Sequence, residues 1–145
     1  MNNHSNSVSR RKFLDSITSA ALAVPFLANS AVSFSSPEKK LRHACIGVGG
    51  MGWHDLQNFK EHPNVDIVAL CDVDAKNLQK AAEVFPDART YIDWRELLDK
   101  EGDKIDSVNV TVPDHNHFAI AYQAIQNGKH VYCQKPLCHD VAEVR

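Results

Sequence analysis

The 145-residue chain has the composition of one ordinary globular domain, with 43% hydrophobic and 23% charged residues. Its 16 Lys and Arg nearly balance 18 Asp and Glu, and its eight His are scattered, so no basic face for nucleic acid is expected. A small molecule is therefore the expected partner.

The first 34 residues resemble an export signal. The pair Arg10-Arg11 is followed by Phe13-Leu14 and by an apolar stretch over 17–28 that is too short, and too rich in Ser, Thr and Ala, for a membrane span. The arrangement resembles the twin-arginine signal, with Asp15 where a lysine is usual. We expect export to the periplasm, with a membrane tether if the signal is not cleaved, and a linker over 35–40. The alternative is a basic tail with a chance Arg-Arg pair.

From residue 41 onward, apolar runs alternate with segments of helical spacing. Strands are expected over 41–48, 65–71, 88–92, 105–112 and 130–133, and helices over 51–62, 75–85, 94–98 and 118–125. Pro86 stops the second helix, Asp93 caps the third, and Asn127-Gly128 closes the fourth. Because strands and helices of this length alternate, we predict an α/β fold with a doubly wound parallel sheet over residues 41–145.

The sequence Gly47-Val48-Gly49-Gly50-Met51-Gly52 has the pattern Gly-x-Gly-x-x-Gly between the first strand and the first helix. Gly47 would permit the tight turn, Gly49 would let a pyrophosphate approach, and Gly52 would let the helix approach the strand. Free N–H groups of the turn, including those of Gly50 and Met51, are then expected to bind the phosphates. Glycine-rich turns of this kind also occur for structural reasons alone.

Asp72 strengthens the dinucleotide interpretation because it ends the second strand, twenty residues after Gly52. A carboxylate there can accept hydrogen bonds from a ribose hydroxyl and repels a 2′-phosphate, which favours NAD over NADP. Lys76 is close enough to leave NADP open. The alternative is a solvated turn residue in the acidic triplet Asp72-Val73-Asp74.

Two further strands end in polar loops at the edge where ligands bind in such sheets. Val112 and Pro113 lead to His115 and His117, which cannot face one way on a helix and have no third ligand nearby, so no metal site is expected. His115 is better explained as a loop residue. Lys135 follows the fifth strand and is a candidate acid–base group, although a lone lysine is usually solvated.

The four cysteines are expected to be reduced. Cys45, Cys71 and Cys133 lie in apolar runs that are typical of buried parallel strands, and no Cys-x-x-Cys or His/Cys cluster supports a zinc site.

With these residues assembled, the chain from about Leu41 to its end resembles the Gfo/Idh/MocA family, named for glucose-fructose oxidoreductase, inositol dehydrogenase and a rhizopine-catabolism protein. The resemblance depends on the glycine motif and Asp72, on Pro113, His117 and Ala121 in the pattern Pro-x-x-x-His-x-x-x-Ala, and on residues 128–133 leading into Lys135-Pro136. The family commonly shows Glu-Lys-Pro, and Gln134 here removes a carboxylate beside the lysine.

The resemblance implies a Rossmann-type NAD(P)-binding domain of a sugar or polyol oxidoreductase. It places Lys135 near the nicotinamide and the reacting carbon, makes Gln134 and Pro136 neighbours of the cofactor, and suggests a cis bond before Pro136. Family members continue into an α+β substrate domain, often with the oligomer interface, so we expect a fragment that is inactive alone and a homo-oligomeric parent. Alternatives are an NAD-dependent glycoside hydrolase of the same family and a non-catalytic dinucleotide-binding module.

Overall fold

The computed structural model describes residues 39–145. The predicted export segment over 1–34 and most of the predicted linker over 35–40 lie outside the described residues. Within the described part, no helix is long and apolar enough to cross a membrane.

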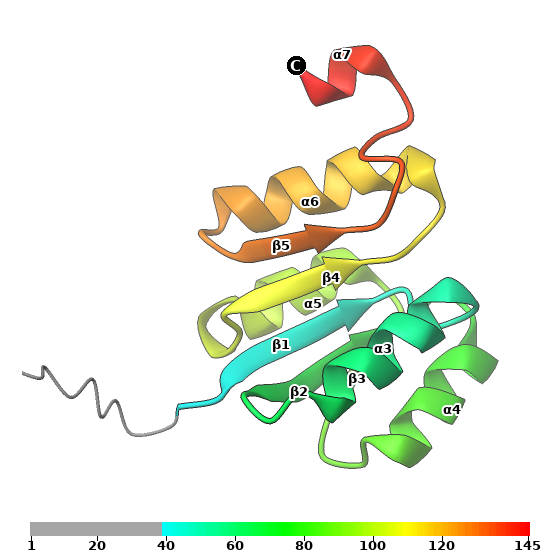
Figure 1. Ribbon diagram of the computed structural model, residues 1–145, viewed down its shortest axis with the longest axis vertical. Coiled ribbons are helices and arrows are strands. Elements are labelled where there is room, and N and C mark those ends of the chain that lie inside the picture. Colours follow the sequence, from blue (N-terminus) through cyan, green and yellow to red (C-terminus); the bar gives the residue numbers. More distant parts are fainter. Residues whose placement is uncertain (1–38) are drawn as a thin grey trace, which may run out of the picture. The chain divides into compact units, whose positions relative to one another are not determined.

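Five parallel strands form a single sheet in the order β3-β2-β1-β4-β5. They span β1 (Leu41–Ile46), β2 (Val65–Cys71), β3 (Arg89–Tyr91), β4 (Ser107–Val110) and β5 (His130–Cys133). All strands point the same way, so the loops after them emerge at one edge (Figure 1). The predicted doubly wound parallel sheet is confirmed.

Helices cover both faces of the sheet: α3 (Met51–Glu61) and α4 (Ala75–Val84) on one, α5 (Trp94–Glu101) and α6 (His117–Gln126) on the other (Figure 1). Each pair of helices has its own core. Leu56 and Leu78 pack with Cys45 and Leu70 of the sheet on the first face, and Leu97 packs with other buried residues on the second. A sheet covered on both faces explains why the strand sequences are continuously apolar.

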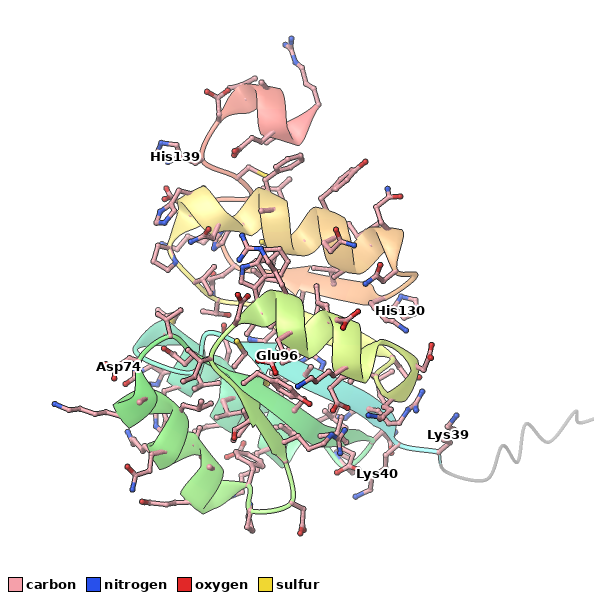
Figure 2. The ribbon with its side chains drawn as sticks, turned by 180° about the vertical axis from the view of Figure 1, so that it is seen from behind. Lys39, Lys40, Asp74, Glu96, His130 and His139 are labelled. Carbon is pink, nitrogen blue, oxygen red and sulfur yellow. The ribbon has the colours of Figure 1, made fainter. Side chains whose placement is uncertain are left out.

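Aspartate side chains cap the N-termini of three helices. Asp74, labelled in Figure 2, accepts from the N–H of Lys76 at the start of α4. Asp93 caps α5 in the same way, as predicted, and Asp140 caps α7 (Val141–Val144). These caps satisfy N–H groups that a helix leaves without internal partners.

Several predicted boundaries differ from those observed. The predicted strand over 105–112 is shorter as β4, because the chain forms a 3-10 turn at Gly102–Lys104 and pairs with β1 and β5 over Ser107–Val110. The predicted helix over 94–98 continues to Glu101, and the predicted helix over 118–125 is α6, which begins after the 3-10 turn Asp114–Asn116. Cys45 and Cys71 are buried thiols, but Cys133 is only partly buried because β5 is the edge strand.

Candidate functional site

A cleft of about 400 Å³ opens at the edge where β1, β2 and β4 end. Of the residues predicted to bind the cofactor, five line it: Gly47, Gly49, Asp72, Val112 and Pro113. Asn77, Trp94, His115 and Asn116 also line it, and sequence reasoning did not assign them to a binding site. The five predicted residues come from three separate loops. The other predicted residues do not line this cleft: Gly50, Met51, Gly52, His117, Gln134, Lys135 and Pro136.

The glycines allow the backbone of the turn to come very close to its neighbours. Gly47 has φ +85, and an added Cβ would lie 2.2 Å from the carbonyl oxygen of Thr111. At Gly52 an added Cβ would lie 2.0 Å from the carbonyl oxygen of Gly47, so α3 packs directly on the end of β1. At Gly49 the nearest atom would be the amide nitrogen of Asn77, a side chain that projects from α4. The turn and packing functions predicted for Gly47 and Gly52 are confirmed.

Asp72 is tied to the glycine turn by its carboxylate. Its Oδ2 accepts from the N–H groups of Val48 and Gly49 at 2.9 and 3.0 Å, and its Oδ1 accepts from the N–H of Asp74 at 2.9 Å. Asp72 is therefore more than a solvated turn residue. The carboxylate thus occupies the N–H groups of Val48 and Gly49, which precede the start of α3.

The start of α3 remains available to an anion. No side chain caps this helix, and the N–H groups of Gly50 and Met51 have no acceptor within residues 39–145. Both residues are exposed, and an added Cβ at Gly50 would meet nothing within 4 Å. Open amides at a helix start, beside a carboxylate at the end of β2, fit the pyrophosphate and ribose of a dinucleotide.

His117 joins the loops that follow β4 and β5. It is 1% exposed, with Nε2 2.8 Å from the carbonyl oxygen of Val112 and Nδ1 2.7 Å from that of Pro136. Both ring nitrogens thus face backbone oxygens. No group of three potential metal ligands occurs within 39–145.

A series of hydrogen bonds connects α3 and the end of β4 to the loop after β5. Asp55 of α3, 8% exposed, accepts from the hydroxyl of Thr111 at 2.8 Å and from Nε2 of Gln134 at 3.3 Å. Oε1 of Gln134 accepts from the backbone N–H of Lys135 at 2.9 Å, and the Lys135 residue is exposed. Asp55 was missed from the sequence, although its place on the inward stripe of α3, between Gly52 and Leu56, was a signal.

A polar contact between His139 and Asp114 connects the segment after Pro136 to the loop after β4. Nδ1 of His139 lies 3.3 Å from Oδ2 of Asp114, and this contact lowers the pKa of Asp114. His139 is labelled in Figure 2 on the segment that leads into α7. The peptide bond between Lys135 and Pro136 is cis, as the resemblance suggested.

A family model described as "Oxidoreductase family, NAD-binding Rossmann fold" (Gfo/Idh/MocA) matches residues 41–145. D-apiose dehydrogenase of Paraburkholderia graminis is 31% identical over 107 residues, which cover 74% of this chain and 28% of that protein. A glycosyl hydrolase family 109 protein of Shewanella sp. is 28% identical over 140 residues, covering 90% of this chain and 30% of that protein.

Solved structures show the same likeness. Myo-inositol 2-dehydrogenase from Lactobacillus plantarum matches with a TM-score of 0.69 and 31% identity, covering 73% of this chain and 31% of that one. GenD2 from gentamicin A biosynthesis, solved in complex with NAD, matches with a TM-score of 0.67 and 30% identity, covering 74% and 30% of the two chains. The chain thus spans less than a third of the length of these proteins.

Proposed function

Since this chain belongs to the Gfo/Idh/MocA family of NAD-binding Rossmann-fold oxidoreductases, we propose that it is the cofactor domain of an enzyme that moves hydride between NAD and a sugar or polyol. The observation that supports this most directly is that Asp72 and Gly49 line one cleft, and that Gly49 directly precedes the open amides at the start of α3. D-apiose dehydrogenase and myo-inositol 2-dehydrogenase are relatives whose names indicate such substrates.

In this proposal the amides of Gly50 and Met51 hold the pyrophosphate, Gly49 lets it approach, and Gly52 lets α3 pack on the end of β1. Asp72 accepts from the adenosine ribose through Oδ1, on which its three backbone contacts leave one lone pair open. Further predicted neighbours of the cofactor lie after the adjacent strands, where Val112, Pro113, His117, Gln134 and Pro136 shape the loops around the nicotinamide half. Lys76 is exposed and close to Asp72 in the sequence, which leaves NADP open, so binding of NADP is measured as well as binding of NAD.

Lys135 is proposed as the catalytic proton-transfer group. When bound, NAD supplies the hydride acceptor for the alcohol carbon. The Lys135 amine would take the proton from the substrate hydroxyl as that carbon becomes a carbonyl, with groups of a further domain completing the site. The exposed Lys135 follows β5, on the sheet edge where the glycine turn also lies.

Cofactor binding is tested by titrating the folded chain with NAD, NADH and NADP. We expect saturable binding of NAD and NADH that is abolished when Asp72→Ala and Gly49→Val are combined. Equal binding by the double variant would contradict the assignment of the cleft. A variant with Asp66→Ala, at an exposed position near the start of β2, is the control.

The role of Lys135 is tested in the full-length protein. Lys135→Ala should abolish most sugar or polyol oxidation while NAD still binds, and Lys100→Ala, at an exposed position of α5, should leave the rate unchanged. An unchanged rate in Lys135→Ala would remove its catalytic role.

The second candidate function is NAD-dependent hydrolysis of glycosides, which the Shewanella relative favours through its name. It predicts cleavage of a glycoside with no net change in NADH absorbance. Net NADH formation from a free sugar or polyol would instead support the dehydrogenase.

We also propose export by the twin-arginine route and assembly of the full-length protein into a homo-oligomer. Arg10→Lys with Arg11→Lys should retain the protein in the cytoplasm, whereas an unchanged distribution would contradict the signal. Sedimentation of the full-length protein tests the assembly, and a monomer would contradict it.

A further inference from the structure

Asp55 is a buried carboxylate that has no cationic partner within residues 39–145. It depends on two uncharged donors, the Thr111 hydroxyl at 2.8 Å and the Gln134 amide at 3.3 Å, both of which reach the same oxygen, Oδ2. A charge removed from water in this way is stable only while its hydrogen-bond donors are kept. Loss of the amide donor would therefore disturb the loop after β5.

Gln134 makes three hydrogen bonds at the end of β5. Its backbone N–H donates to the carbonyl oxygen of Val110 at 3.0 Å, which extends the pairing between β4 and β5. Its Nε2 donates to Asp55, and its Oε1 accepts from the Lys135 backbone N–H at 2.9 Å. The carboxylate fixes this orientation of the amide, because the flipped amide would place Oε1 against a negative oxygen.

We propose that Asp55 is a positioning residue for Lys135, acting through Gln134. This inference rests on the proposed catalytic role of Lys135 and adds the groups that hold its backbone. It also accounts for glutamine, where the family commonly has glutamate, in front of the lysine. A carboxylate at position 134 would replace a hydrogen bond to Asp55 with a contact between two negative charges, and their repulsion would turn the side chain away from the Lys135 N–H that it now accepts from.

The test compares Gln134→Glu with the double variant Asp55→Asn plus Gln134→Glu. In the double variant the new amide at position 55 donates to the new carboxylate at position 134, so the hydrogen bond and the total charge of the pair are restored with exchanged roles. Hydrogen exchange of the Lys135 backbone amide, measured by NMR on the chain, should become roughly tenfold faster in the single variant and return to the original rate in the double.

Two controls separate this effect from general loss of stability. Exchange of the buried Val108 amide should stay unchanged. Gln123→Glu, the same charge change at an exposed position of α6, should leave the exchange rate of the Lys135 amide unchanged. If Gln134→Glu raises exchange at Val108 as well, Gln134→Met removes both side-chain hydrogen bonds without adding a charge and gives the same test. Unchanged exchange at Lys135, or a double variant no better than the single one, overturns the proposal.

A functional measurement in the full-length protein completes the test. The single variant should lower kcat about tenfold with little change in the KM for NAD, and the double variant should restore kcat. If Lys135→Ala oxidises the substrate at the original rate while the exchange results are as expected, the proposed catalytic role of Lys135 is wrong. The contact by which Asp55 and Gln134 hold the Lys135 backbone would still be supported. If Gln134→Glu raises the KM for NAD and leaves kcat unchanged, the positioning role is overturned.

Discussion

His117 is a single side chain that ties two loops together, because its ring nitrogens face the carbonyl oxygens of Val112 and Pro136. We predict that His117→Ala lowers the free energy of unfolding by about 2 to 4 kcal/mol, through the lost buried ring and its hydrogen bonds. It should also weaken NAD binding. Urea unfolding and NAD titration measure the two effects, and His54→Ala, an exposed histidine of α3, is the control. A urea midpoint equal to that of the original chain would show that the tie contributes nothing.

Asp72 organises the glycine turn through charge-assisted hydrogen bonds. We predict that Asp72→Asn, which keeps the shape but removes the charge, weakens NAD binding roughly tenfold, as isothermal titration would show. Asp74→Asn is the matched control in the same turn, because asparagine also caps helices well and α4 should remain intact. An equal loss of NAD affinity in both variants would mean that the charge of Asp72 contributes no more to NAD binding than that of Asp74.

The placement of Gly47, Gly52 and Asp72 could be predicted because these residues follow one another around a single strand–helix–strand unit. Asp55 and Asn77 could not, since their contacts join positions far apart in the chain and depend on which way a side chain turns. Gln134 was interpreted as the loss of a carboxylate beside the Lys135 amine. The structure adds a contact that the sequence did not indicate, because the Gln134 side chain turns inward to Asp55.

Between elements, the contact of α3 with β1 depends on the absence of a side chain at Gly52. We predict that Gly52→Ala lowers the free energy of unfolding by about 3 kcal/mol, because its Cβ would lie 2.0 Å from a backbone oxygen that cannot move without shifting the strand. Gly102→Ala is the comparison, because its backbone is helical, at φ −46 and ψ −45, and an added Cβ would meet nothing within 4 Å. Thermal unfolding of both variants tests this order, and a less stable Gly102→Ala would contradict it.

Helix starts were easier to predict than helix ends. Asp93 marks the start of α5 by its side-chain chemistry, but the apolar spacing stops at Leu98 although the helix continues. The next inward residue is Glu101, only 1% exposed, which accepts from Arg89 Nε at 2.7 Å and the Tyr91 hydroxyl at 2.6 Å. A charged residue buried by an ion pair with another element interrupts the apolar pattern without interrupting the helix.

For the whole molecule, alternation of strands and helices was sufficient to predict a parallel sheet, because right-handed crossovers allow few other arrangements. The sequence did not indicate which strand forms an edge. β5 lies at one edge, which leaves Tyr132 half exposed and Cys133 only partly buried despite an apolar run like those of the inner strands.

Acid should destabilise the whole fold through His43, which is 3% exposed in β1, with its Nδ1 2.7 Å from the Ser107 hydroxyl and its ring against Phe59. Burial lowers its pKa from 6.5 to about 4. Between these values the unfolded chain binds a proton that the folded chain does not, so stability is fully present above pH 6.5 and is lost as the pH falls toward 4.

The loss should reach about 3 kcal/mol at most, which urea unfolding at a series of pH values would measure. His43→Gln, which carries no titrating ring, should be less stable at neutral pH but should lack this part of the acid dependence. His54→Gln, at an exposed position, should keep it. Other carboxylates also titrate at low pH, so the quantity that decides is the difference between the two variants. If the free energy of unfolding falls equally with pH in His43→Gln and His54→Gln, His43 does not couple folding to pH.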